Sequence, residues 1–215
     1  MKLTYFELYG RAEPIRMLLH HSKTEYENKI ITAEEFGAMK ASGELPCGQV
    51  PIFECDGKVM NQSVPILRYL GTKKNYYNPA DADTAYDADW VMATVDDTMN
   101  KDFFMIFFRN LAAPASEEDL KIRCEMQAKC FAQLDAKLGD NKYFGGNAMN
   151  IGDFYAFTFL TSFAKNKKGA EKQAHVYAAL DAEFAQFKNL VRWNETMLGE
   201  GGFAEYLAAR PAGSL

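Results

Sequence analysis

The spacing of hydrophobic residues differs between the first third of the chain and the rest. Segment 2–9 is aromatic and β-prone, and segment 26–31 has the composition of a second strand. Between them, segment 12–23 carries apolar residues at i, i+3 and i+4, from Ile15 to Leu19, which is the pattern of an amphipathic helix. The beginning of the chain therefore predicts a β-α-β unit.

The following segments predict a further helix, a hairpin and a closing helix. Segment 33–42 has the composition of a weaker helix. In segment 51–60 an Asp-Gly pair separates two apolar runs, which predicts a type I′ hairpin between antiparallel strands. Segment 63–71 has a proline near its start and Gly71 at its end, which mark a helix and its C-terminus. Together these elements predict a small α/β domain over residues 1–73.

Helical spacing replaces this mixture after a linker at 74–83, which is rich in Lys, Asn, Pro and Asp. Segment 84–111 has no glycine or proline and carries one apolar stripe at steps of four, which predicts a long helix. Segment 117–139 predicts a second long helix, and segment 150–165 is apolar nearly all round, as expected at the centre of a bundle. We expect an all-helical domain over 84–215. The stripe consists of Val91, Val95, Met99, Phe103 and Phe107.

Composition and charge exclude several classes of partner. The 215 residues are 48% hydrophobic, which is ample for a sizeable core. The formal net charge of -5 leaves no basic excess to displace counterions from nucleic acid. The longest apolar runs, such as 103–108, are too short to span a bilayer, and no stretch of signal-peptide length precedes Glu7. We therefore expect a cytoplasmic protein without a nucleic-acid or membrane partner.

The cysteines and histidines do not follow the spacing of metal ligands. The chain has four cysteines without a CxxC pair, and its three histidines form no ligand pattern. The sequence therefore predicts neither a metal site nor a disulfide framework, and reduced thiols fit the cytosol.

Tyr5 and Arg11 fall where open α/β sheets bind ligands. Tyr5 lies on the first predicted strand, and Arg11 lies in the turn before the first predicted helix. The end of such a strand and the start of such a helix frame a crevice, in which a phenol and a guanidinium are donors for an anion. A strand tyrosine is more often a core residue and a turn arginine more often a solvated one, so the residues alone leave both roles open.

Segment 49–67 combines features of a peptide-binding edge. Pro51 has no N–H and suits the first residue of a strand. A cis Val50–Pro51 bond would instead turn the backbone of Val50 toward an extended ligand. Ser63 lies at or near a helix start, where it either caps the helix or helps free N–H groups to bind a carboxylate.

Two further groups of polar residues lie on the predicted helices. Asp96 and Asp97 interrupt the apolar stripe, and they fit a solvated face, a weak cation site or an ammonium partner. Asn150 and Asp153 have the spacing of a capping box, which predicts a helix start at this point.

Five segments, YFELYGRAEPIR, QVPIFECDG, NQSVPILRYL, TVDD and NIGDFYAF, occur in this order along the chain. Together they resemble the cytosolic glutathione S-transferases, and most of all the sigma class, which includes glutathione-dependent prostaglandin D synthase. The resemblance covers essentially the whole chain. It implies a thioredoxin-like N-terminal α/β domain, an all-α helical-bundle C-terminal domain and a homodimer.

The resemblance also implies roles for individual residues. Tyr5 matches the catalytic tyrosine, and Arg11 matches an arginine near the glutathione sulfur. Asp97 matches an acid that reaches the other subunit's site, and Asp96 matches a position linked to divalent-cation effects in some sigma relatives. The residues that match glutathione contacts are Tyr5, Phe36, Lys40, Gln49, Val50, Pro51, Gln62, Ser63 and Asp97.

The chain departs from the sigma pattern at the glycyl end of the expected glutathione site. Phe36 stands where that pattern often has tryptophan, and Gln49 stands where it often has lysine. Phenylalanine donates no hydrogen bond and glutamine carries no charge, so both changes weaken this part of the grip. Segment 40–51 is also longer than in the pattern.

The function implied by the resemblance is transfer of glutathione to a small apolar electrophile. Glutathione is then the co-substrate, no metal is required, and Tyr5 and Arg11 hold the thiol as a thiolate. The same residues fit a glutathione-dependent isomerase of the prostaglandin D synthase type, or a non-catalytic glutathione-binding or crystallin-like structural protein. The expected electrophile pocket lies between the domains and is lined by Tyr9, Met99, Phe103 and Tyr155.

Overall fold

A computed structural model describes residues 1–104, 116–166 and 174–210. The N-terminal part contains a four-stranded sheet with the order β2-β1-β3-β4. β1 pairs in parallel with β2 and antiparallel with β3, and β3 and β4 form the predicted hairpin. Asp56 and Gly57 in its turn have φ values of 52° and 74°, as a type I′ turn requires. The strands are β1 (Lys2–Tyr5), β2 (Glu27–Ile30), β3 (Ile52–Cys55) and β4 (Lys58–Asn61).

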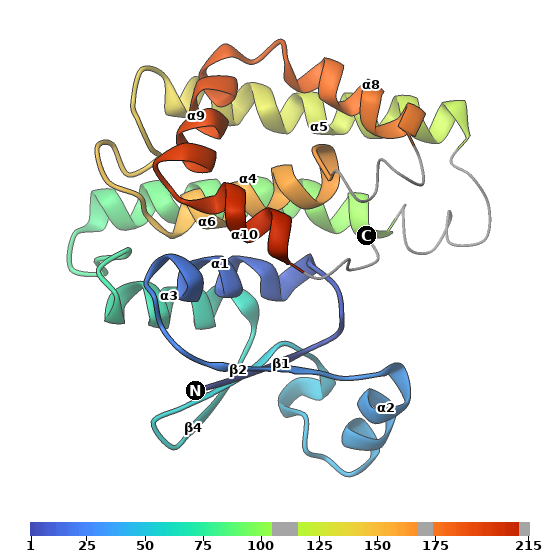
Figure 1. The fold of residues 1–215 in the computed structure, drawn as a ribbon, viewed down its shortest axis with the longest axis vertical. Coiled ribbons are helices and arrows are strands. Elements are labelled where there is room, and N and C mark those ends of the chain that lie inside the picture. The colour runs from blue at the N-terminus through green and yellow to red at the C-terminus, as the bar shows by residue number, and fades with distance from the viewer. Residues whose placement is uncertain (105–115, 167–173, 211–215) are drawn as a thin grey trace.

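Helices cover the sheet on the side of the C-terminal part of the chain. α1 (Glu13–His21) and α3 (Ser63–Lys73) lie between the sheet and the upper helices in Figure 1, whereas α2 (Ala33–Ala41) lies away from them. α1 starts with Pro14 in its first turn and buries every residue from Glu13 to Leu19. It therefore joins the sheet to the helical part of the molecule.

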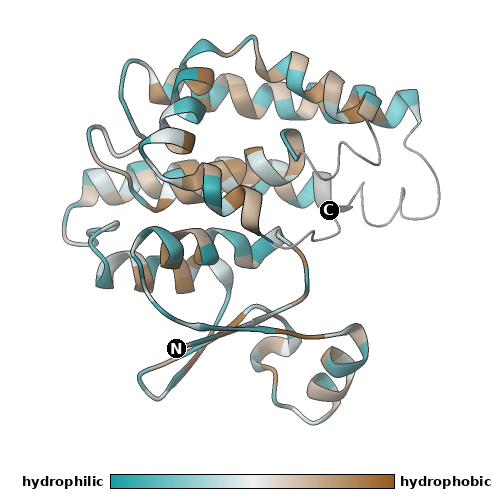
Figure 2. Cartoon of the chain, viewed as in Figure 1, coloured by the Kyte–Doolittle hydropathy of each residue, from teal (hydrophilic) through white to brown (hydrophobic). Residues whose placement is uncertain are grey.

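The helical part is built around α6, whose residues are all buried. α6 packs against both α4 and α1, and it continues into a π-helical segment at Leu160–Ala164. Figure 2 shows hydrophobic and hydrophilic residues alternating along α4 and α5, as expected for amphipathic helices that cover a central one. The helices are α4 (Ala82–Phe104), α5 (Glu117–Leu138), α6 (Ile151–Phe159), α8 (Ala174–Phe184), α9 (Lys188–Gly199) and α10 (Phe203–Ala209).

The prediction that a helix ends at Gly71 is wrong, because α3 continues to Lys73. A Cβ atom added to Gly71 would lie 2.5 Å from Cγ2 of Ile151 and 2.9 Å from Cβ of Tyr77. Such a distance is too short for any real side chain. Gly71 therefore allows α3 to approach the start of α6, and it does not serve as a C-cap.

The capping box predicted at Asn150 and Asp153 is confirmed. The Asn150 side chain accepts from the N–H groups of Gly152 and Asp153, and the Asp153 carboxylate accepts from the N–H of Asn150. Trp193 of α9 also donates its indole N–H to Asp153, over 2.8 Å. Asp153 therefore fixes the start of the central helix and ties α9 to it.

Other boundaries differ from the sequence prediction at their ends. β1 stops at Tyr5 rather than at residue 9, because the chain then turns into a short 3₁₀ segment at Gly10–Ala12. The end of the helix predicted over 84–111 falls partly outside the described residues. The domain division at 74–83 stays a prediction. Of the helices described, none is long and apolar enough to cross a membrane.

Candidate functional site

A cavity of about 650 Å³ opens at the carboxyl end of β1, beside the start of α3. This volume lies within the range of pockets that hold small organic ligands. Its lining comes from the end of β1 and the loop after it, from α2 and from the segment before β3. The start of α3 and the polar face of α4 complete it. The lining residues are Tyr5, Phe6, Leu8, Arg11, Phe36, Gln49, Val50, Pro51, Gln62, Ser63 and Asp96.

Tyr5 is held at this cavity by the turn that follows its strand. Its hydroxyl oxygen accepts a hydrogen bond from the backbone N–H of Arg11, over 3.2 Å. Gly10 makes this approach possible, because a Cβ atom there would lie 2.8 Å from the Tyr5 hydroxyl and its φ is +37°. The phenol proton is thereby left available as a donor, since the N–H of Arg11 occupies the acceptor side of the oxygen.

The acidity of Tyr5 results from opposing effects. Burial raises the pKa of the phenol, while the N–H of Arg11 and the positive charges of Arg16 and Arg11 lower it. Burial has the larger effect, so the net pKa lies above the ordinary value. Tyr5 therefore stays protonated at neutral pH and can donate a hydrogen bond to an anion in the cavity.

The segment before β3 forms one wall of the cavity. The Val50–Pro51 bond is cis, as predicted, and both residues line the cavity. Gln49 is exposed, and its side-chain oxygen accepts a hydrogen bond from Gln62 over 3.1 Å. Two segments that are separate in the sequence are thus linked at the cavity edge.

The start of α3 forms a neighbouring part of the wall. Gln62 holds the N-cap position with φ 69° and ψ 116°, and its side chain makes no capping bond. This backbone conformation is unfavourable for a residue with a Cβ atom, and such strain is concentrated at functional sites. Ser63 is the first residue of the helix and is buried, with 7% of its surface exposed. This helix start has no capping side chain and borders the cavity, which makes it suitable for a carboxylate.

Arg11 is held by side chains of α4 and α6, although 32% of its own side chain remains exposed. Its guanidinium forms a 2.7 Å ion pair with Asp96 and donates to the Tyr155 hydroxyl over 3.2 Å. Tyr155 in turn donates to Asp96 over 2.5 Å. The second terminal nitrogen of the Arg11 guanidinium donates to the side chain of Asn100. Burial is the largest effect that raises the pKa of Tyr155 far above its ordinary value. Arg11 is therefore a cation at the edge of the cavity that is paired with Asp96 and held by Tyr155 and Asn100.

Three of the predicted glutathione contacts lie at or beyond the edge of the cavity. Phe36 lines it and packs edge-on against Phe6, with 5.3 Å between ring centroids. Lys40 is exposed and approaches Gly48, next to Gln49. Asp97 is exposed on α4 and is not among the lining residues.

The residues predicted for the electrophile pocket are not gathered at one cavity among the described residues. Tyr9 lines a second cavity of about 110 Å³ on the other side of the loop after β1. Met99 is buried in the core with 3% of its surface exposed. Tyr155 is not among the residues that line the first cavity, and it contacts the lining residues Arg11, Asp96 and Ser63. The side chain of Phe103 lies outside the described part of the chain.

Four residues near the site were not predicted for these roles. Phe6 and Leu8 line the cavity, Asp96 is the ion-pair partner of Arg11, and Arg16 lies over the ring of Tyr5. An arginine next to the apolar residues Ile15 and Met17 of α1 was the available sign for Arg16. No comparable sign existed for the pairing of Asp96 with Arg11, because 85 residues separate them.

Over the ranges that the structure describes, no three His, Cys, Asp or Glu side chains gather as they would around a metal ion. Asp96, the position considered for a cation, is engaged with Arg11 and Tyr155.

Comparison with family models identifies both parts of the chain. Residues 1–72 match the N-terminal domain of glutathione S-transferases, and residues 95–200 match their C-terminal domain. The first match contains the cavity-lining segments of the sheet domain, and the second contains Asp96 and Tyr155.

Individual relatives agree with these matches. The chain is 33% identical to hematopoietic prostaglandin D synthase of Gallus gallus, over 84% of this chain and 88% of that protein. It is 30% identical to glutathione S-transferase 3 of Caenorhabditis elegans, over 98% of this chain and 96% of that protein. Among solved structures, that of NaGST-2 superposes with a TM-score of 0.79 at 24% identity, over 98% of this chain and 96% of that one.

Proposed function

The chain belongs to the glutathione S-transferase family, and from this premise we propose that the cavity beside Tyr5 binds glutathione and ionises its thiol. The activity is that of a glutathione S-transferase, in which the thiolate is conjugated to a small apolar electrophile. The sulfur attacks the electrophilic carbon, a leaving group such as halide departs, and the thiol proton passes to water.

The position of Tyr5 is the observation that carries this proposal. Its phenol lines a cavity of about 650 Å³, and its oxygen already accepts the N–H of Arg11. The remaining hydrogen bond is directed to a ligand. A free cysteine thiol has a pKa of about 8.5, so a donor that favours the anion is needed at neutral pH. Each unit by which the thiol pKa falls corresponds to about 1.4 kcal/mol.

The remaining contacts are assigned to the parts of the tripeptide. The backbone of Val50 pairs with the cysteinyl residue, and Gln62 and Ser63 bind the γ-glutamyl carboxylate at the start of α3. Phe36, Lys40 and Gln49 lie toward the glycyl end. The open helix start and the strain at Gln62 support this arrangement.

We also propose that the functional unit is a symmetric homodimer in the cytoplasm. Asp97 is exposed on α4 and makes no contribution to its own cavity, which supports a role toward a second subunit. In such a dimer its carboxylate would pair with the α-ammonium group of glutathione bound to the partner. The electrophile would enter beside Tyr5, toward the end of α4.

The test uses two ligands and a panel of electrophiles. Calorimetry should detect binding of glutathione and of an analogue with serine in place of cysteine. Only glutathione should give a conjugate with an aromatic halide. Binding without turnover on any electrophile would replace this proposal by the non-catalytic binder. Absence of binding would refute both.

Isomerisation is the second candidate, because a hematopoietic prostaglandin D synthase is 33% identical over 84% of the chain. In that reaction the thiolate opens an endoperoxide and glutathione is regenerated. Product analysis with an endoperoxide substrate distinguishes the two activities, since conjugation consumes glutathione and isomerisation does not.

A further inference from the structure

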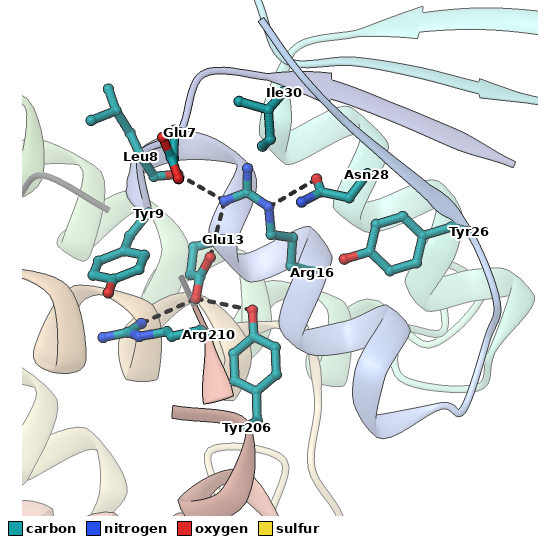
Figure 3. Close-up of a pocket in the computed structure, with 10 residues that line it drawn as sticks. All are labelled: Glu7, Leu8, Tyr9, Glu13, Arg16, Tyr26, Asn28, Ile30, Tyr206 and Arg210. Carbon is teal, nitrogen blue, oxygen red and sulfur yellow. Dashed lines mark hydrogen bonds and ion pairs between the residues drawn. The ribbon is translucent and has the colours of Figure 1, made fainter. Parts of the chain in front are cut away.

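Three charged side chains are buried behind the loop that separates the two cavities. Glu13 and Arg16 belong to α1, and Arg210 follows α10. They are only 1%, 7% and 8% exposed, respectively. One oxygen of Glu13 accepts from Arg16 over 3.1 Å, and the other accepts from Arg210 over 3.0 Å (Figure 3). Buried charges are costly unless they are paired, and this cluster is paired throughout.

Arg16 connects this cluster to the wall of the larger cavity. Its guanidinium donates to the backbone carbonyl of Leu8 over 2.8 Å and to that of Phe6 over 3.4 Å. Both residues line the cavity. The third contact is to the side chain of Asn28 on β2, over 3.3 Å, as Figure 3 shows. A single buried side chain therefore fixes the loop on which the cavity depends.

The same guanidinium lies over the aromatic ring of Tyr5. Its central carbon is 5.7 Å from the ring centroid, which is within the range of a cation–π contact. Arg11 contacts the same tyrosine only through its backbone N–H, and its own guanidinium is directed to Asp96. Arg16 is thus the cation that faces the ring.

We propose that Arg16 is a positioning residue for Tyr5, which holds the phenol and the loop after β1 in place and strengthens the phenol as a hydrogen-bond donor. This inference rests on the proposed function, because it assigns Arg16 to the same reaction. Arg16 touches neither glutathione nor the electrophile. It acts through the ring and through the carbonyls of Phe6 and Leu8.

The electrostatic reason is that a positive charge over an aromatic face withdraws electron density from the ring. The O–H bond of the phenol then becomes more acidic and stabilises a bound thiolate better. In agreement with this, the charge of Arg16 lowers the pKa of Tyr5 against the effect of burial.

The C-terminal helix secures Arg16 through Glu13. Tyr206 of α10 donates to Glu13 over 3.0 Å, and Arg210 also donates to the carbonyl of Thr161 in the π-helical segment. The far side of Glu13 is thereby held by two donors, so its near oxygen has a fixed position for Arg16. Loss of Arg16 would still leave Glu13 paired, which makes neutral substitutions of Arg16 compatible with folding.

The experiment measures the pKa of the glutathione thiol bound to the dimer, from the ultraviolet absorbance of the thiolate across a pH series. Arg16→Gln should raise this pKa by about half a unit to one unit. kcat/KM should fall about 3- to 10-fold at neutral pH and recover at high pH. Arg16→Lys, which keeps the charge, should restore most of the shift. If Arg16→Gln does not fold, Arg16→Met replaces it, because an apolar chain needs no partner in this position.

Arg210→Gln is the matched control. This substitution removes a buried arginine from the same carboxylate of Glu13. The central guanidinium carbon of Arg210 lies 3.7 Å from the ring centroid of Tyr9, and Arg210 does not lie over Tyr5. The substitution should lower thermal stability and leave the thiol pKa unchanged. An unchanged thiol pKa in the neutral Arg16 variant would overturn the inference, and so would an equal shift in Arg210→Gln.

A ligand-free measurement separates this inference from the proposed function. The phenol of Tyr5 can be titrated as the difference in absorbance between the wild type and Tyr5→Phe. The same difference in the Arg16→Gln background should show a higher pKa for Tyr5. If the wild type forms no thiolate, the proposed function fails, and this titration alone still decides whether Arg16 acts on Tyr5.

Discussion

Replacing Asp153 by asparagine removes a buried carboxylate that joins three parts of the helical domain. One oxygen accepts from the N–H of Phe144 and the indole of Trp193, over 2.9 Å and 2.8 Å, and the other accepts from the N–H of Asn150. Asparagine has only one acceptor oxygen, so its amide group would face at least one of these donors. A buried donor without an acceptor costs about 1–3 kcal/mol, which is the expected loss of unfolding free energy near pH 8.

The pH dependence of this loss follows from the pKa of Asp153. Burial raises the pKa to about 6, although hydrogen bonds from Asn150, Phe144, Trp193 and Gly145 oppose it. Because the folded pKa lies above that of the unfolded chain, the folded state binds the proton more tightly. The wild type therefore gains stability as the pH falls and loses this contribution as the pH rises through 6. The difference in unfolding free energy between the wild type and the asparagine variant should grow by about 1 kcal/mol between pH 8 and pH 5. Its upper limit of about 3 kcal/mol would be reached only below the pKa of the unfolded chain.

Urea unfolding at a fixed protein concentration, in steps from about pH 8 to pH 5, measures the difference. His21 titrates in the same range, and burial lowers its pKa, so its contribution to stability is lost as the pH falls. Both proteins contain His21, so its effect cancels in the difference. A gap that stays constant or narrows toward pH 5 would refute the reasoning, because the donors would then outweigh burial.

Three further substitutions test the site. Asp97→Ala should weaken glutathione binding by about 1–3 kcal/mol in calorimetry and leave unfolding of the subunit unchanged; an unaltered Kd would contradict the contact across the dimer. Mixed dimers of Tyr5→Phe and Asp97→Ala chains should regain about half of the wild-type activity, since one site carries both defects, and no recovery after verified exchange would place Asp97 elsewhere. Tyr155→Phe removes a hydroxyl from Arg11 and should reduce kcat about 10-fold with little change in KM; equal turnover would show that Asp96 and Asn100 position Arg11 without Tyr155. Ser63→Ala should weaken glutathione binding about 10-fold, and unchanged binding would leave Ser63 with no role toward the carboxylate.

Local chemistry explains which parts of the fold could be predicted from sequence. The Asp-Gly turn at Asp56 and the capping box at Asn150 depend on neighbouring residues, and the structure confirms both. Gly71 was misread because its role is set by Ile151, far along the chain, which needs the space that a side chain would fill. Such a contact leaves no pattern near the glycine.

The same distinction applies to the site. Tyr5, Pro51 and Ser63 could be predicted as neighbours of a ligand, because each follows from a strand end or a helix start, and all three line one cavity. The network of Arg11 with Asp96 and Tyr155 depends on packing between the two parts of the chain. The residues chosen for an electrophile pocket shared only an apolar or aromatic character, which cannot determine which cavity each one lines.

The pKa of glutathione's thiol in the wild type and in Tyr5→Phe tests the central claim most directly. The ultraviolet absorbance of the thiolate, followed from about pH 5 to pH 10 with saturating glutathione, gives this pKa. In the wild type it should fall well below the free value of about 8.5, and in Tyr5→Phe it should return toward that value. Turnover at neutral pH should then drop about 10- to 1000-fold, as expected for the loss of one donor to an anion. The same thiol pKa in both proteins would contradict the account, because Tyr5 would then only fill space beside the cavity.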